Sequence, residues 1–263
     1  MIVLGFDTAT RSTAVGLRLA DGSALQARDD PAAAGSPGHA TRLLAMVAEL
    51  LELAGVAWSE LDRIAVGLGP GRFTGLRVGA TTARGLAQSL SLQLAGVSTL
   101  AALAEAAAVQ GAEGCDGVLP VIDALRGEAF AGAYLVAGAR ADGELSFPGP
   151  VAPEALQSIA AQADERAGAG RRRWLAVGDG AVRYRLDLES AGVSVPADES
   201  PLHLVQGGTV CELGARGLAA SAYEQVVPDY RRAADARMAR TTPGVAAGGT
   251  RSRQPGSRVG SQS

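Results

Sequence analysis

The sequence predicts an α/β protein built from a duplicated unit, and three features support this. An apolar run that ends in an acid, Ile2–Asp7, is followed by an extended segment, and the same pattern recurs at Val118–Asp123. Two segments with helical periodicity, 39–54 and 75–90, lie between the two runs. Strands that alternate with helices favour sheets covered by helices, and the weak internal repetition indicates two similar units.

In the first half, turn residues and periodicity place the elements in order. Extended segments at 14–19 and 24–28 flank the turn Asp21-Gly22. The helix from 39 to 54 carries apolar residues over far more than one stripe, so we expect it to bury two faces. A buried strand at 64–68 then leads into the glycine-rich segment Gly69–Gly75 and a second helix.

The second half repeats this order more loosely. We expect strands at 118–123, 129–136 and 174–177, helices at 153–167 and 204–220, and a tight turn at Gly178–Gly180. After Met238 the chain consists largely of Gly, Ser, Thr, Arg and Pro without an aromatic residue, so we predict disorder. The tail arginines could contact nucleic acid weakly, although a solvated tail is the simpler interpretation.

Composition limits the classes of function. The chain has 263 residues, 47% of them apolar, and no apolar run reaches the length of a membrane span. Residues 1–6 fit a strand better than a signal segment, so we predict a cytoplasmic location. The net charge is −3, but without the five arginines from Arg237 onward, 19 basic residues face 27 acidic ones, or −8. This charge argues against the body binding RNA unaided.

Several kinds of chemistry lack the residues that they need. Every basic residue apart from the two histidines is Arg, which excludes a P-loop lysine and Schiff-base chemistry. Cys115 and Cys211 form no CxxC motif, which argues against a disulfide framework or a zinc site. His39 and His203 are far apart in sequence, so neither a metal-hydrolase spacing nor a serine nucleophile with a nearby base is indicated.

Two turns are candidate anion sites. The run Asp7-Thr8-Ala9-Thr10 ends a strand and could hold phosphate or hydrated magnesium, or its side chains could simply satisfy the amides of the turn. The loop Gly69–Gly75 could place helix-start amides against an anion, with Thr74 as a helix cap, or serve as a tight turn only. Local sequence leaves both interpretations open.

A stripe of small residues, Gly75, Gly79, Ala83 and Ala87, recurs every four positions along the second helix. Glycine inside a helix costs about 1 kcal/mol relative to alanine, so tolerance of two glycines indicates a close contact. That contact lies either within the chain or with a partner. In the second case the helices 39–54 and 75–90 would form half of a helix bundle between subunits.

In the turns and helices described above, the chain resembles the TsaB family, also called YeaZ, whose members have the actin/Hsp70/sugar-kinase fold. The resemblance covers about 1–237, and its most specific part is the block Gly-Pro-Gly-x-Phe-Thr-Gly-x-Arg at 69–77. The other matching stretches are 2–10, 39–44, 67–85, 96–100, 123–130, 178–180 and 228–232.

The resemblance implies an α/β, two-lobed, actin/Hsp70-like duplicated fold. It places lobes at 1–100 and 101–225, a closing segment at 226–237 and the disordered tail at 238–263. The implied partner interface lies on the two helices at His39, Leu43, Met46, Val47, Leu50, Gly75, Leu76, Gly79, Thr82, Ala83 and Leu86. The implied phosphate-type turns, vestigial in this family, contain Asp7, Thr8, Thr10, Gly69, Gly71, Thr74, Asp123, Gly178, Asp179 and Gly180.

The resemblance also implies a function without catalysis. The related catalytic family, TsaD, binds metal through two histidines four residues apart, and the matching positions here are Thr99 and Leu103, which cannot replace imidazole. We therefore expect no metal, no catalytic residue and no cofactor, although some nucleotide binding is allowed. The expected role is to activate and scaffold TsaD, together with the ATPase TsaE, in forming N6-threonylcarbamoyladenosine in tRNA, which the chain meets through the complex. A homodimer is possible, and a membrane partner is not expected.

Three alternatives remain at this point. An actin-like ATPase or small-molecule kinase acting alone would use Asp7 and Asp123 to position magnesium. A glycoprotease, suggested by an old label of the related family, lacks a metal site and a nucleophile–base pair. A self-associating scaffold would use the same helices for pairing with itself.

Overall fold

A computed structural model describes residues 1–32, 35, 37–112, 114–138, 140–146, 149–168, 170–217 and 223–231, with only the backbone at 142–146. Met1–Arg232 forms one compact unit. The tail predicted at 238–263, and most of the closing segment predicted at 226–237, lie outside the described residues. No helix in the described part of the chain combines the length and apolarity needed to cross a bilayer.

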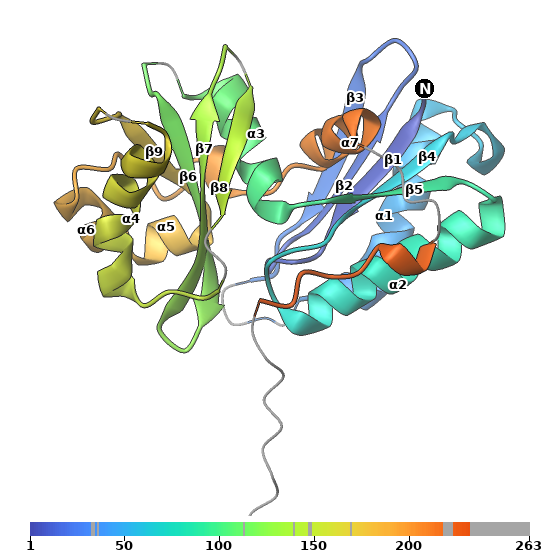
Figure 1. The fold of residues 1–263 in the computed structure, drawn as a ribbon. Coiled ribbons are helices and arrows are strands. Elements are labelled where there is room, and N and C mark those ends of the chain that lie inside the picture. The colour runs from blue at the N-terminus through green and yellow to red at the C-terminus, as the bar shows by residue number, and fades with distance from the viewer. Residues whose placement is uncertain are drawn as a thin grey trace, which may run out of the picture. The chain divides into compact units, whose positions relative to one another are not determined.

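Strands within the described residues form two sheets (Figure 1). The first sheet contains β1 (Val3–Asp7), β2 (Thr13–Arg18), β3 (Ala24–Asp29), β4 (Arg63–Gly67) and β5 (Gln93–Val97) in the order β3-β2-β1-β4-β5. The second sheet contains β6 (Gly117–Leu125), β7 (Glu128–Val136), β8 (Ala141–Ser146) and β9 (Trp174–Val177) in the order β8-β7-β6-β9.

The two sheets repeat one topology. In the first, β1, β2 and β3 are antiparallel and β4 runs parallel to β1. In the second, β6, β7 and β8 are antiparallel and β9 runs parallel to β6. The registers match as well, because Asp7 pairs with Ala14 and Asp123 pairs with Ala129 at the same end of each hairpin. The duplicated α/β unit predicted from the sequence is confirmed.

The helices connect and cover these sheets. The α-helices are α1 (His39–Ala54), α2 (Phe73–Leu90), α3 (Thr99–Gln110), α4 (Pro153–Arg166), α5 (Asp179–Arg183), α6 (Arg185–Ser190) and α7 (Gly207–Arg216). The short 3-10 turns are η1 (Trp58–Glu60), η2 (Pro201–His203) and η3 (Tyr223–Gln225).

Three apolar clusters show how the helices pack. Helices α1 and α2 bury Leu43, Met46 and Val47, among others, against the first sheet. Helices α4, α5 and α6 pack on the second sheet around Leu156 and Leu188. A third cluster joins α3 and α7 with residues of both sheets, so the first sheet carries α7 on the face opposite α1 and α2 (Figure 1).

Helix α7 approaches the first sheet at backbone distance, which only glycine allows. A methyl group added to Gly16 of β2 would lie 2.3 Å from the carbonyl carbon of Gly207, and one added to Gly5 of β1 would lie 2.7 Å from Cys211 Sγ. A segment from late in the chain therefore covers the first hairpin, whose glycines are explained by this contact.

Some predicted elements differ from the structure. Helix α7 begins at Gly207 and not at 204, because the backbone of Gln206 is extended after η2. Gly178 has a φ of 106° and leads into the short helix α5, where a turn alone was predicted. Helix α1 buries one broad face and not two, since Leu44 is 50% and Leu53 73% exposed. The predicted boundary between lobes at residue 100 falls within α3 and stays a prediction.

Candidate functional site

The first predicted turn, Asp7–Thr10, is an internal connection within the half of the chain that forms the first sheet. Asp7 ends β1 and is 1% exposed; its Oδ1 accepts a hydrogen bond from the Ala9 amide at 2.7 Å, and its Oδ2 accepts one from the Thr99 hydroxyl at 2.7 Å. Burial raises the pKa of the Asp7 carboxyl. A methyl group at Gly67 would lie 1.8 Å from Oδ2, so the Gly67 backbone packs directly against this oxygen.

The glycine-rich loop packs on this turn. The Gly69 amide donates to Thr99 Oγ1 at 3.1 Å, and the Arg72 amide donates to the Ala9 carbonyl at 2.7 Å. A methyl group at Gly71 would lie 2.3 Å from the same Ala9 carbonyl oxygen. The glycines are therefore explained by the close approach of two turns. Thr74 was predicted as a helix cap, but α2 begins after Arg72 without a side-chain cap, and Thr74 is exposed in the first turn.

The first turn also holds α2. The Thr8 hydroxyl donates to the Gly75 carbonyl at 2.7 Å. Thr10 is half-buried. Burial, the larger effect, lowers the pKa of His39, and the Thr10 carbonyl, the smaller effect, raises it. His39 Nδ1 lies 2.9 Å from Thr13 Oγ1, and His39 Nε2 is buried without a hydrogen-bond partner. His39 is thus a packed residue at the start of α1, and its imidazole is not available as a general base.

The second unit contains the corresponding acids. Asp123 Oδ1 accepts from the Leu125 amide at 3.0 Å, which repeats the contact between Asp7 and Ala9 two residues apart. The Asp123 amide donates to Asp179 Oδ1 at 2.9 Å, and Arg183 forms an ion pair with Asp123 Oδ2 at 3.3 Å. Burial raises the pKa of the Asp179 carboxyl.

The turn around Asp179 is as closely packed as the first one. Methyl groups at Gly178 and Gly180 would lie 2.2 Å from Val121 O and 2.8 Å from the Ile122 carbonyl carbon. The predicted turn residues therefore lie within two networks of internal hydrogen bonds. Among the described residues, no group of three or more His, Cys, Asp or Glu side chains could hold a metal ion.

The two positions that the resemblance matched to a metal-binding histidine pair, Thr99 and Leu103, are buried. Thr99 begins α3, is 0% exposed, and joins Asp7 to Gly69 through its hydroxyl. Leu103 lies one turn later, is 1% exposed, and packs in the cluster between the sheets. Neither side chain offers a free ligand atom.

The small-residue stripe faces the protein's own first sheet, so the close contact that its glycines indicated lies within the chain. A methyl group at Gly75 would lie 1.8 Å from Thr8 O, and one at Gly79 would lie 2.5 Å from Thr8 Oγ1. Ala83 and Ala87 are 0% exposed. A large side chain at Gly79 would disturb the fold before it met any partner.

Most of the residues predicted for the partner interface are buried as well, while the interface itself stays a prediction. His39, Leu43, Met46, Val47, Leu50, Gly75, Leu76, Gly79 and Ala83 are all buried within the chain, whereas Thr82 and Leu86 are half-buried. The surface that these helices offer consists of other residues. On α1 it includes Thr41, Leu44, Ala45 and Ala48, and on α2 it includes Arg77, Thr81 and Gly85.

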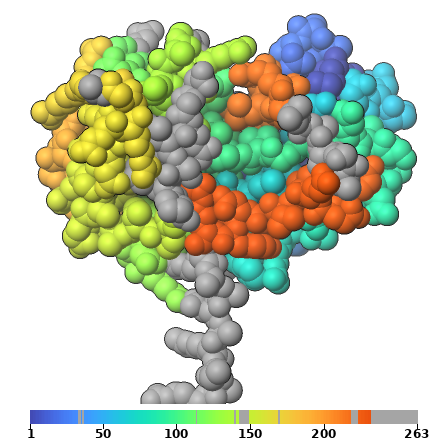
Figure 2. Space-filling model, viewed as in Figure 1, coloured from blue at the N-terminus to red at the C-terminus, as the bar shows by residue number. Residues whose placement is uncertain are grey.

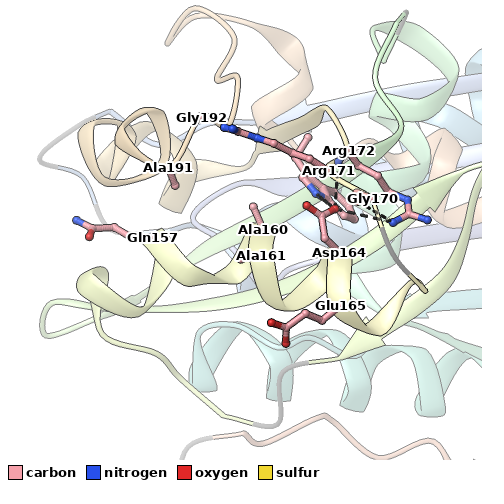
Figure 3. A pocket seen from close by; sticks show the side chains of 11 residues that line it. Gln157, Ala160, Ala161, Asp164, Glu165, Gly170, Arg171, Arg172, Ala191 and Gly192 are labelled. Atoms are coloured by element: carbon pink, nitrogen blue, oxygen red, sulfur yellow. Dashed lines mark hydrogen bonds and ion pairs between the residues drawn. The ribbon is translucent and has the colours of Figure 1, made fainter.

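Two features were not predicted from the sequence. Phe73 and Tyr230 are 44% and 43% exposed, and their ring centroids lie 5.3 Å apart. The second feature is a hollow of about 450 Å³ in the second unit (Figure 3). Asp164 in this hollow accepts from Trp174 Nε1 at 3.0 Å and from the Arg172 amide at 3.2 Å, so its carboxylate is occupied internally. None of the residues that line the hollow was a predicted site residue.

Comparisons with known proteins agree with this architecture. Residues 31–169 match the family model described as "TsaD: tRNA N6-adenosine threonylcarbamoyltransferase". A 96-residue stretch is 40% identical to the tRNA threonylcarbamoyladenosine biosynthesis protein TsaB of Escherichia coli K12 and covers 36% of this chain and 41% of that protein. The TsaB of Bacillus subtilis is 37% identical over 97 residues, which cover 36% of this chain and 40% of that protein. Each alignment thus spans about two fifths of the relative.

Solved structures match over a much larger part of the chain. YeaZ from Pseudomonas aeruginosa is 30% identical with a TM-score of 0.66, and the alignment covers 87% of this chain and 100% of that one. A second structure, described as an uncharacterized protein with similarity to peptidase YeaZ from P. aeruginosa, is 32% identical with a TM-score of 0.70, over 88% and 99% of the two chains. The predicted duplicated α/β fold is confirmed, and this chain belongs to the TsaB (YeaZ) family.

Proposed function

We propose that this chain is a non-catalytic subunit of the complex that forms N6-threonylcarbamoyladenosine in tRNA, and that it activates and scaffolds the transferase TsaD. Relatives named for the biosynthesis of this nucleoside support the pathway. The site supports a role without catalysis, because the acids that could do chemistry accept hydrogen bonds from amides and a hydroxyl of the same chain.

The observation that carries the proposal is the environment of Thr99 and Leu103. The Thr99 hydroxyl donates to Asp7 and accepts from Gly69, and Leu103 is enclosed in the core. A metal that activates an acyl donor needs open ligand positions lined by imidazole or carboxylate. These two positions contribute to stability, so the transfer chemistry falls to a partner.

The docking surface that we propose is the exposed side of α1 and α2. Leu44 is 50% exposed on α1, where Ala45 and Ala48 are also exposed, and Gly85 is exposed on α2. Small exposed residues let a second pair of helices approach closely, and a large aliphatic side chain such as Leu44 provides apolar area to bury. TsaD is the proposed occupant, TsaE joins the assembly, and a homodimer through the same surface is the competing state.

Reconstitution tests the role directly. Purified TsaD, TsaE, tRNA and the threonylcarbamoyl donor are assayed for modified adenosine with and without this chain. We expect product only when the chain is added, and no product from the chain and tRNA without TsaD. Modification of tRNA by this chain unaided would contradict the proposal.

A pair of exposed leucines tests the surface. Leu44→Asp places a charge in the proposed interface and should weaken association with TsaD at least tenfold, because an unpaired buried charge is costly. Leu186→Asp is the matched control, since Leu186 on α6 is 81% exposed in the second unit. Equal association of both variants, measured by light scattering or calorimetry, would place the interface elsewhere.

We further propose that the phosphate-type turns act as internal connections and not as a nucleotide site. The closed contacts at Asp7 Oδ2 support this. Calorimetry with ATP and magnesium should show no binding at Asp7, and ATP hydrolysis by the purified chain that Asp7→Asn abolishes would favour the ATPase alternative. Peptide cleavage that survives chelation of metals would favour the protease alternative.

A further inference from the structure

A second hollow, of about 530 Å³, adjoins the one in Figure 3 and is lined by basic side chains. The two hollows share Arg171, Arg172, Trp174 and Gly192, so they flank the same segment, which leads into β9. The charged residues that line the second hollow are Arg171, Arg172 and Arg173, and no acid of the described chain lines it. Helix α4, which borders the first hollow, is exposed among the yellow-coloured residues in Figure 2.

Backbone hydrogen bonds fix the walls of the second hollow. The Asp116 amide donates to the Arg173 carbonyl at 2.8 Å, and the Arg173 amide donates to Asp116 Oδ2 at 2.8 Å. These bonds hold the segment before β6 against the segment before β9. On the other side, the Ser194 amide donates to the Trp174 carbonyl at 3.0 Å. The hollow is therefore formed before any ligand arrives, which lowers the entropic cost of binding.

Two guanidinium groups lie against glycines that line this hollow. A methyl group added to Gly192 would lie 2.7 Å from Arg171 Nη2, and one added to Gly114 would lie 3.4 Å from Arg173 Nη1. Figure 3 shows the Arg171 side chain reaching toward Gly192. Gly192 and Gly114 have left-handed backbones, with φ values of 79° and 75°, which glycine adopts without strain. Both turns thus leave room for a guanidinium group beside the backbone.

The charge of these arginines is only partly balanced. Arg172 forms an ion pair with Asp164 at 3.9 Å, so it is engaged with α4. The side chain of Arg173 is 72% exposed and lies 3.7 Å from Asp116 Oδ2, and an exposed pair of this kind contributes little. Arg171 makes no hydrogen bond or ion pair with the residues that the structure describes. Arg171 and Arg173 therefore both retain donors for an anion.

We propose that the second hollow binds the phosphate group of a small phosphorylated molecule, held by Arg171 and Arg173. Arginine binds phosphate through paired N–H donors, and a phosphate monoester carries about −1.5 to −2 charges at pH 7, enough for two guanidinium groups. A carboxylate carries a single charge and matches one arginine. The volume of about 530 Å³ lies within the range of small-molecule sites, so an organic group can accompany the phosphate.

This site is separate from the docking surface proposed for TsaD. The arginines precede β9 of the second sheet, whereas α1 and α2 pack on the first sheet. A partner on the exposed side of α1 and α2 therefore does not need these residues. The inference goes beyond the proposed function and does not rest on it.

The experiment measures binding of phenyl phosphate to the full chain by calorimetry, at low salt and in a buffer without phosphate. We expect saturable binding of phenyl phosphate, weaker binding of benzoate and no binding of phenol. Arg171→Gln and Arg173→Gln should each weaken the binding of phenyl phosphate about tenfold or more, as expected for loss of a charged hydrogen bond. Both residues are exposed, so the variants should keep the fold. Arg42→Gln is the matched control, since it removes an exposed arginine that lies 3.6 Å from Asp29.

The inference is overturned if phenyl phosphate does not bind, if benzoate binds as tightly, or if Arg171→Gln and Arg173→Gln bind phenyl phosphate like the wild type. Titration with an RNA duplex distinguishes the source of the phosphate. Duplex binding that both variants weaken, without binding of phenyl phosphate, would assign the arginines to a nucleic-acid backbone and contradict a small ligand. These titrations contain no TsaD, so their failure and the failure of reconstitution are separate results.

Discussion

Replacing Gly75 with alanine tests whether the small residues of α2 face the protein's own sheet. The added methyl would lie 1.8 Å from the carbonyl oxygen of Thr8, and contacts under 3.0 Å essentially never occur, so helix and turn must separate by about 1.2 Å or more. Because the obstacle is backbone, we place the cost of overpacking near 3 kcal/mol. Alanine regains about 1 kcal/mol of helix propensity, which leaves a net loss of about 2 kcal/mol.

Gly85→Ala is the matched control on the same helix. Gly85 is exposed, and nothing lies within 4 Å of the position of an added methyl. This variant should gain about 1 kcal/mol from helix propensity with no steric cost. For a chain of this size, 1 kcal/mol shifts Tm by about 2–4 °C. Gly75→Ala should therefore melt about 4–8 °C below the wild type, and Gly85→Ala about 2–4 °C above it.

Thermal and urea denaturation of the purified variants, followed by circular dichroism, provide the assay. A Gly75→Ala protein as stable as Gly85→Ala would refute the packing argument, because it would mean that the stripe has open space beside it. The stripe would then be available to a partner, as the sequence had suggested.

Three further predictions concern buried polar groups. Thr99→Val should lower the free energy of unfolding by about 2–4 kcal/mol, because it removes the hydrogen-bond partner of the Gly69 amide and of Asp7 Oδ2. Urea denaturation beside the exposed control Thr81→Val checks this. Burial lowers the pKa of His39 below its usual 6.5, so the contribution of this residue to stability is complete above about pH 6.5 and is lost as the pH falls. His39→Gln should therefore flatten the dependence of stability on pH in this range, and an equally steep dependence in the variant would contradict the prediction. Burial raises the pKa of Asp179, so stability is lost as the pH rises above 3.8; Asp179→Asn keeps the acceptor for the Asp123 amide and should unfold at higher urea concentration than the wild type at pH 7.

Much of the fold could be predicted because local patterns are strong. The strand–acid–strand pattern at Asp7 and Asp123 predicted the duplication, and the structure repeats it down to the hydrogen bond from the carboxylate to the amide two residues on. Helix α3 was missed, because its residues are apolar on all sides and show no periodic face. The aromatic cluster was missed for a different reason, since Phe73 and Tyr230 are 157 positions apart and nothing local connects them.

The sequence by itself determined the duplicated strand–acid–strand pattern, the family and the lack of histidine at positions 99 and 103, because periodicity, turn residues and ligand chemistry are properties of short segments. Only the tertiary structure decided what covers each face. Helical spacing shows that Gly75, Gly79 and Ala83 lie on one side, but it cannot tell whether a partner or the first sheet packs there. Thr8 and β4 lie against that side, so the surface open to partners consists of the residues on the opposite faces of α1 and α2.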